Sequence, residues 1–171
     1  RALDEFARGG GTLVFINSST QFAIDQLKLP VRNVVAGLQS KDYFASGSIL
    51  EVNVANSHPV MAGMRDKAKV FVDRSPGFTT TEGFSGVGLA WYQTAGSPHL
   101  SRYLLGAKYI NGYAAALDVT HGRGHVVLIG FRPQWRGQPM GTFRVMFNAA
   151  LYGREVGCKL DVKQVWSPPK K

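Results

Sequence analysis

Apolar residues recur first at helical and then at strand-like spacing at the start of the chain. Residues 3–7, LDEFA, place three apolar side chains on one helix face, and the glycines at 9–11 are typical of a helix end. The continuous apolar run TLVFI, residues 12–16, predicts a buried strand. Residues 18–20, SST, offer N-cap side chains for a second helix that ends near Leu27.

The middle of the chain has the alternation typical of strands with one solvated face. In SILEVNVA, residues 48–55, apolar and polar side chains alternate. AKVFVD, residues 68–73, is expected to pair with this strand antiparallel, and VGLAWYQ, residues 87–93, predicts a third strand. We expect a short helix over residues 98–105.

A hairpin and a helix are expected in the last third of the chain. YAAALDV and HVVLIGF, residues 113–119 and 125–131, flank the glycine-containing turn THGRG. After a polar stretch, an apolar stripe at helical spacing predicts a helix packed against the sheet: Phe143, Met146, Phe147, Ala150 and Leu151. The pattern as a whole predicts an α/β domain over residues 1–165, with a central mixed or parallel sheet flanked by helices, and a loose tail over 166–171.

Composition and charge narrow the class of protein. The chain has 171 residues, of which 44% are hydrophobic, enough for one domain with a substantial core. Its net charge of +9 comes from dispersed side chains, with no basic run longer than Lys170-Lys171, so nucleic acid is not expected as a partner. The sequence has no apolar run of the roughly eighteen residues that a membrane span needs. The single cysteine, Cys158, excludes an internal disulfide and a cysteine-rich metal site.

The sequence lacks the usual motifs for metal, phosphate or nucleophilic chemistry. His121 and His125 have the spacing of helical metal ligands, but the glycines between them predict a hairpin, and no His-x-x-Glu occurs. We therefore expect no bound metal and no cofactor, and interpret these two residues, His58 and His99 as solvated or locally hydrogen-bonded. No P-loop and no G-x-S-x-G motif is present, and Cys158 follows the last predicted helix instead of opening one.

The polar stretch after the second hairpin strand, RPQWRGQ, is the candidate functional site. Open α/β sheets place ligands at the carboxyl ends of their strands. Arg132 and Arg136 can hold a carboxylate or phosphate with forked donors. Gln134 and Gln138 can add hydrogen bonds, and Trp135 can add a flat apolar wall.

This stretch has three possible functions: docking, ligand binding and catalysis. Docking against another domain is favoured because Arg and Trp are enriched at protein interfaces. Binding of a small anionic ligand is the second hypothesis. Catalysis is the least favoured, because no base or nucleophile stands near these residues in the sequence.

The same stretch resembles a motif of the class I glutamine amidotransferases. That family has Gln-Phe-His-Pro-Glu after a late buried strand, and its His and Glu complete a Cys-His-Glu triad. The matching residues here are Gly130 to Gln134, with Arg132 at the histidine position and Gln134 at the glutamate position. Arginine cannot serve as a base, and glutamine carries no charge to orient an imidazolium. The family's cysteine-bearing nucleophile elbow has no counterpart in the sequence, so the resemblance implies a degenerate triad.

A wider resemblance covers most of the chain. LDEFARGGGTLVFIN, LPVRNVVAGL, SHPVMAGM and residues 122–151 together look like the C-terminal amidotransferase-like domain of large bacterial proteins that begin with a zinc carboxypeptidase domain of the carboxypeptidase A type. The resemblance implies a flavodoxin-like fold that lacks its first α/β unit here. It also implies a non-catalytic accessory domain of a secreted or periplasmic protein, with zinc confined to the upstream peptidase domain as its partner. An anion-binding module and an amide hydrolase with an unconventional site are the alternatives.

Overall fold

The computed structural model describes residues 1–137, 139–153 and 166–169. The α-helices in these residues are α1 (Ala2–Arg8), α2 (Ser19–Leu27) and α3 (Phe143–Leu151), and short 3-10 turns occur at η1 (Pro59–Met61), η2 (Ala107–Tyr109) and η3 (Met140–Thr142). The strands are β1 (Thr12–Ile16), β2 (Val31–Asn33), β3 (Phe44–Ala45), β4 (Ser48–Val54), β5 (Lys67–Val72), β6 (Phe78–Thr80), β7 (Gly86–Trp91), β8 (His99–Ser101), β9 (Leu104–Leu105), β10 (Ala114–His121) and β11 (Gly124–Ile129).

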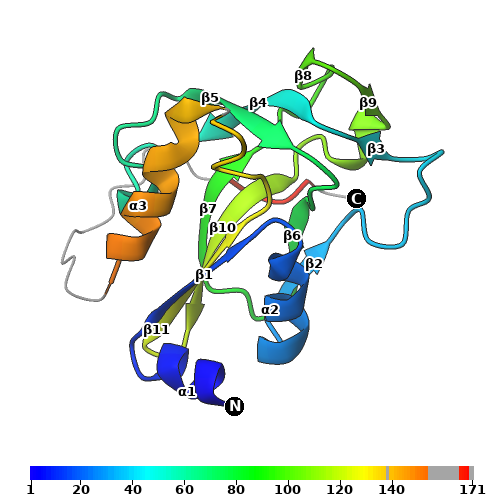
Figure 1. Cartoon of the computed structure of the whole chain (residues 1–171). Coiled ribbons are helices and arrows are strands. Elements are labelled where there is room, and N and C mark those ends of the chain that lie inside the picture. Colours follow the sequence, from blue (N-terminus) through cyan, green and yellow to red (C-terminus); the bar gives the residue numbers. More distant parts are fainter. Residues whose placement is uncertain (138, 154–165, 170–171) are drawn as a thin grey trace.

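A mixed central sheet organises the chain (Figure 1). Its main path runs β1-β11-β10-β7-β4-β5, and β2, β6 and β8 attach to this path. Within the described strands only β1 and β11 are parallel, with Thr12 opposite His125, and the other pairs are antiparallel. The predicted α/β class with a mixed sheet flanked by helices is therefore confirmed.

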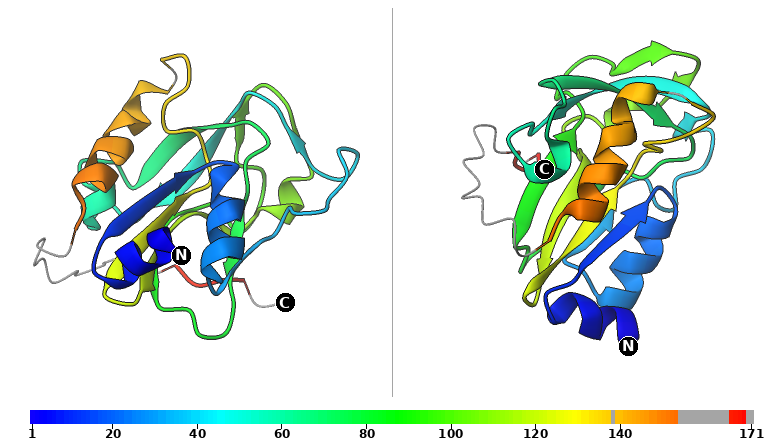
Figure 2. Two further views of the ribbon diagram at one scale, coloured as in Figure 1. Left: turned by 60° about the horizontal axis from the view of Figure 1, so that its bottom comes forward. Right: turned by 60° about the vertical axis from the view of Figure 1, so that its left-hand side comes forward.

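The sheet separates two apolar layers, and helices cover both of its faces (Figure 2). On one face α3 and η1 pack over β4, β5, β7, β10 and β11, with a core that includes Val60, Val70, Val127, Ile129 and Val145. On the other face α1 and α2 pack over β10 and β11, with a core that includes Ala7, Ile24, Leu27, Val126 and Leu128. This three-layer arrangement buries both sides of β10 and β11, which explains their nearly unbroken apolar sequences.

Several elements follow the sequence pattern closely. Leu50, Val52 and Val54 of β4 are buried, while the residues between them are half-buried. β4 pairs antiparallel with β5, as expected. The predicted hairpin is β10 and β11, and Gly122 in its turn has a φ of 66°, a conformation that glycine adopts without steric cost.

Two predictions of local structure need correction, one for a strand and one for a helix. Residues 12–16, expected as a buried strand, are half-buried throughout, because β1 lies at one end of the strand order and pairs within the described residues only with β11. Residues 98–105, expected as a helix, contain β8 and β9 instead. These short strands pair with β4 and β3, and those long-range contacts are not visible in the local sequence.

The buried face of α3 is not the predicted stripe. Val145, Ala149 and Tyr152 point into the core, whereas Phe147 is 65% exposed and Leu151 is 82% exposed. Polar contacts set the rotation of the helix. The Asn148 side-chain amide donates to the carbonyls of Val60 and Ala62 at 3.2 and 3.0 Å, and these bonds bring one flank of α3 against η1. A pattern that scores apolarity alone cannot detect such an anchor.

The expected loose tail does not hold at its first residue. The Trp166 side chain is buried, and its indole N–H donates to the Gly112 carbonyl at 2.8 Å. The ring packs against Gly88, where a Cβ atom would lie 2.7 Å from Trp166. In the described part of the chain, no helix combines the length and apolarity needed to cross a bilayer.

Two substitutions in α3 test its orientation. Val145→Ala should reduce the free energy of unfolding by about 1–3 kcal/mol, because it removes fully buried methyl groups from a packed layer. Phe147→Ala should change it by about 0.5 kcal/mol or less, since most of that ring already contacts solvent. Urea denaturation of both variants measures the difference, and a larger loss for Phe147→Ala would contradict the observed face.

Candidate functional site

Three strands of the sheet end close together. The alternation of pairings makes β1, β5 and β11 run in the same direction, so their carboxyl ends share one side of the molecule. Asn17 follows β1, Asp73 follows β5, and Arg132 comes three residues after the end of β11. The Arg132 backbone N–H donates to the Phe71 carbonyl at 2.9 Å and bridges the last two of these ends. We call this group the strand-end cluster.

Asn17 is the junction of the strand-end cluster. Its backbone N–H donates to the Ile129 carbonyl at 2.7 Å, and its side-chain amide donates to the Asp73 carbonyl at 3.2 Å. Its side-chain oxygen accepts a 2.7 Å bond from the Ser75 hydroxyl. The residue is only 5% exposed, so one buried side chain connects β1 to the segment after β5.

The backbone of Asn17 has the form of a nucleophile elbow. The residue lies between β1 and α2 with a φ of 52°, a left-handed conformation that is uncommon for residues other than glycine. In enzymes with such an elbow, a strand-to-helix turn of this kind presents the nucleophile. Here the turn is present although its sequence motif is not, and the side chain is an amide that cannot act as a nucleophile. Elbow motifs are defined by a serine or cysteine with flanking glycines, so they do not identify Asn17.

Arg132 is held in place within the strand-end cluster. Its guanidinium Nη2 lies 3.4 Å from an Asp73 carboxylate oxygen, and its Cζ lies 4.3 Å from the centre of the Trp135 ring. The side chain is 28% exposed. A half-buried cation that both pairs with a carboxylate and stacks on an aromatic ring contributes to the local structure as well as to the surface charge.

Trp135 is the centre of the loop formed by residues 132–137, which we call the Trp135 loop. Phe71 stacks on its ring at a centroid distance of 6.2 Å, and the Arg136 guanidinium lies 5.6 Å from the ring centre. The structure therefore brings together Arg132, Trp135 and Arg136, three of the residues singled out in the sequence. Gln134 is exposed on the same loop. Gln138, the fifth, lies outside the described residues, as does Cys158.

The strand-end cluster and the Trp135 loop beside it offer hydrogen-bond donors, positive charge and an aromatic ring. The Ser75 hydroxyl is buried and donates to Asn17, and neither the Arg132 guanidinium nor the Gln134 amide is a base. No side chain of the cluster, as far as the described residues go, forms a nucleophile paired with a base. The two guanidinium groups and the indole face can instead hold an anionic or flat partner group.

A second polar cluster is buried near the opposite end of the sheet. The Asp118 carboxylate on β10 is 3% exposed and has three neighbours. His125 Nδ1 lies 3.1 Å from both carboxylate oxygens, and the Tyr152 hydroxyl donates to Oδ2 at 2.9 Å. His58 Nε2 lies 3.3 Å from Oδ2, outside hydrogen-bond geometry but close enough for electrostatic attraction. Because Nδ1 of His58 accepts the Val60 N–H, its proton belongs on Nε2, which faces Asp118.

The expectation of solvated or locally bonded histidines is wrong for His121 and incomplete for His58. His58 is fully buried and lies beside Asp118 of a distant strand in addition to its local bond from Val60, whereas His125 contacts Asp118 within the β10–β11 hairpin. His121 contacts Asp4 of α1 at 2.6 Å. Within the described residues, no group of three or more His, Cys, Asp or Glu side chains is arranged to hold a metal ion. The signal that sequence reasoning lacked was Asp118, an acid inside an otherwise apolar strand.

The residues of the second cluster shift one another's pKa values. Burial alone would raise the pKa of Asp118, but contacts with His125 and His58, the charge of His125 and the Tyr152 hydroxyl outweigh it and lower that pKa. The bond to Asp118 raises the pKa of His125 despite the opposing effect of burial. Burial, followed by the charge of Asp118, raises the pKa of Tyr152. The cluster is therefore a buried carboxylate stabilised in its ionised form.

The pH dependence of stability tests this cluster. A lowered Asp118 pKa stabilises the fold above the ordinary value of 3.8 and ceases to do so as the pH falls through the lowered value. A raised His125 pKa stabilises the fold below 6.5 and ceases to do so as the pH rises through the raised value. The difference in melting temperature between the wild-type chain and Asp118→Asn should thus be largest from pH 3.8 to 6.5. A difference that stays constant from about pH 5 to about pH 8 would show that these groups are not coupled.

Comparison with solved structures identifies the fold of the chain, whereas comparison with protein families identifies no family. Neither a protein-family model nor a curated protein matches the sequence. Similar solved structures include the cytoplasmic proteins STM3548 and STM1381 of Salmonella typhimurium, each 14% identical with a TM-score of 0.51, over 90% and 87% of this chain. A candidate GMP synthase subunit from Thermoplasma acidophilum is 11% identical over 86% of the chain, with a TM-score of 0.52. The chain spans 57–60% of the length of these structures. It has an amidotransferase-like α/β fold.

Proposed function

We propose that the chain is a non-catalytic binding domain that docks a neighbouring protein domain through the Trp135 loop. The strongest support is that the backbone has the form of a catalytic elbow, whereas the side chains at the site are not those of a catalytic triad. The elbow backbone at Asn17 carries an amide, and in the resemblance to the amidotransferase motif Arg132 and Gln134 take the positions of that family's histidine and glutamate. At the surface, the Trp135 loop presents a half-buried tryptophan with two guanidinium groups near its ring.

The Trp135 loop has the properties of a preorganised interface. Phe71 and Arg132 both contact the Trp135 ring and restrict its movement, so a partner would not bear the full entropic cost of ordering that side chain. Arg136 is exposed and adds a cation beside the ring. Trp and Arg are the residue types most enriched at the energetic centres of interfaces.

The partner that we propose is an upstream zinc carboxypeptidase domain of the same protein, with a secreted or periplasmic location. Its support is the resemblance of residues 3–17, 29–38, 57–64 and 122–151 to the C-terminal domain of such proteins. In this proposal zinc and hydrolysis belong to the peptidase domain. A small anionic ligand on Arg132 and Arg136 is the competing use of the same loop. An amide hydrolase would need a nucleophile and a base that the described part of the strand-end cluster does not offer.

Substitutions at the two arginines separate docking from folding. Arg136→Ala should weaken binding to the separately produced peptidase domain by about tenfold or more, while its free energy of unfolding changes by about 0.5 kcal/mol or less. Arg132→Ala should weaken binding and also lower the melting temperature, because it removes the contacts with Asp73 and Trp135. Calorimetric titration and thermal melts measure the two effects.

Arg32→Ala is the matched control, since Arg32 is an exposed cation on β2, away from the loop. It should bind like the wild-type chain. Normal binding by Arg136→Ala, or equal weakening by Arg32→Ala, would contradict docking through the Trp135 loop.

A further inference from the structure

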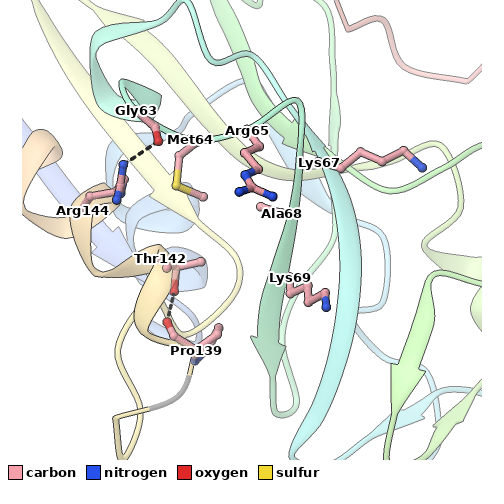
Figure 3. A pocket seen from close by; sticks show the side chains of 10 residues that line it. Gly63, Met64, Arg65, Lys67, Ala68, Lys69, Pro139, Thr142 and Arg144 are labelled. Atoms are coloured by element: carbon pink, nitrogen blue, oxygen red, sulfur yellow. Dashed lines mark hydrogen bonds between the residues drawn. The ribbon is translucent and has the colours of Figure 1, made fainter.

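A cavity of about 370 Å³ lies between the start of β5 and the turn that enters α3 (Figure 3). Its first wall consists of residues 63–65 and 67–69, from the segment that leads from η1 into β5. Its second wall consists of Pro139, Gly141 and Thr142 with Arg144 of the first turn of α3. The cavity differs from the strand-end cluster in place and in residues, and none of the sequence motifs indicated it.

The charged residues that line the cavity are all cationic, while Asp66, which lies between two of them in sequence, is outside the lining and accepts a hydrogen bond from the Asn56 amide. Four cationic side chains line it, and the described lining residues include no carboxylate: Arg65, Lys67, Lys69 and Arg144. Lys67 is paired outside the lining with Glu51, at 2.8 Å. Arg144 donates one N–H to the Gly63 carbonyl, which positions its guanidinium at the rim and leaves further N–H groups for another acceptor. A cleft with walls of one charge concentrates ions of the opposite charge.

The walls between these cations are apolar. Met64, Ala68 and Pro139 supply hydrocarbon and thioether surface. In Figure 3 the Met64 side chain lies between the guanidinium groups of Arg65 and Arg144, while Lys67 and Lys69 extend on the other side of β5. Arg65 and Arg144 are therefore the two cations placed to act together on a group inside the cavity.

We propose that this cavity binds a small organic anion, whose carboxylate or phosphate group is held by Arg65 and Arg144 and whose apolar body rests on Met64, Ala68 and Pro139. Guanidinium groups bind both kinds of oxyanion through paired N–H donors, which a lysine does not provide. The volume is near the lower end of the range for ligand pockets, which suits a small metabolite-sized molecule.

The position of the cavity connects it to the Trp135 loop. The Thr142 hydroxyl, which lies in the cavity wall, donates to the Pro133 carbonyl at 2.6 Å. A ligand that orders the turn before α3 would therefore act on the segment that carries Trp135. The binding site itself does not depend on docking by that loop, and the two proposals can fail separately.

Calorimetric titration of the whole chain at low ionic strength tests the site with defined probes. The probes are 3-phenylpropionate and phenyl phosphate as anions with an apolar body, 3-phenylpropionamide as the neutral analogue, and inorganic phosphate as an anion without the body. We expect at least one of the first two to bind with one-to-one stoichiometry. The neutral analogue and inorganic phosphate should each bind at least about tenfold more weakly.

Substitutions of residues that line the cavity test whether the anion binds there. Arg65→Gln and Arg144→Gln should each weaken the anion by about tenfold or more, and Ala68→Leu, which fills the cavity without changing its charge, should do the same. Lys41→Gln removes an equal charge from an exposed position outside the cavity and should leave the affinity unchanged. Thermal melts establish that each variant is folded.

Three results would overturn the proposal. The first is the absence of saturable binding by either organic anion. The second is equal affinity for 3-phenylpropionate and its amide, or for phenyl phosphate and inorganic phosphate, since the site is defined by both charge and apolar walls. The third is unchanged affinity in folded Ala68→Leu, or equal weakening by Lys41→Gln, because either would place the anion on the general basic surface.

Discussion

The left-handed conformation of Asn17 determines how the ends of three strands meet. A strand that passes into a helix within two residues needs a sharp turn, and a positive φ at the first residue supplies it. Asparagine tolerates this conformation better than most residues and also carries a side chain that can bond in two directions. Both bonds of that side chain go to the segment after β5, and the backbone N–H goes to the end of β11. The surface that Arg132 and Trp135 form is built on this junction.

One segment of the chain then connects every polar feature of interest. Residues 130–153 begin at the strand-end cluster, continue through the Trp135 loop, form a wall of the basic cavity and end at Tyr152 against Asp118. The buried Asp118 cluster fixes the end of α3 to the sheet, while Asn148 fixes its flank to η1. The rotation of α3 therefore depends on polar bonds at defined positions, and the helix can leave Phe147 and Leu151 at the surface.

The sequence predicts the elements of this fold better than their partners. Alternation in β4 and the glycine turn between β10 and β11 are local properties, and both predictions are confirmed. The resemblance around Phe131 implied an amidotransferase-like fold, and the similar solved structures support it. β8, β9 and the face of α3 depend on contacts with distant segments, and predictions from local periodicity were wrong there.

The candidate site likewise contains residues that the local sequence predicts and residues that only the folded topology brings together. Arg132, Trp135 and Arg136 lie near one another in sequence, so their proximity could be anticipated. Asn17 and Asp73 come from other strands and join the site only through the topology of the sheet. Asp118 is a single acid in an apolar strand, and nothing local shows that two histidines and a tyrosine surround it. The basic cavity combines the segment after η1 and the start of β5 with η3 and the first turn of α3, which are far apart along the chain.

A double-mutant cycle on Asn17 and Ser75 tests the central claim that one side chain holds the strand ends together. Asn17→Gly retains access to the left-handed conformation and removes only the side-chain bonds, and Ser75→Ala removes the facing hydroxyl. Urea denaturation of both single variants and the double variant gives their coupling energy. We predict a favourable coupling of about 1 kcal/mol or more, as expected for contacting residues in one buried network. Additivity within about 0.3–0.5 kcal/mol would contradict the account, because independent sites behave in that way.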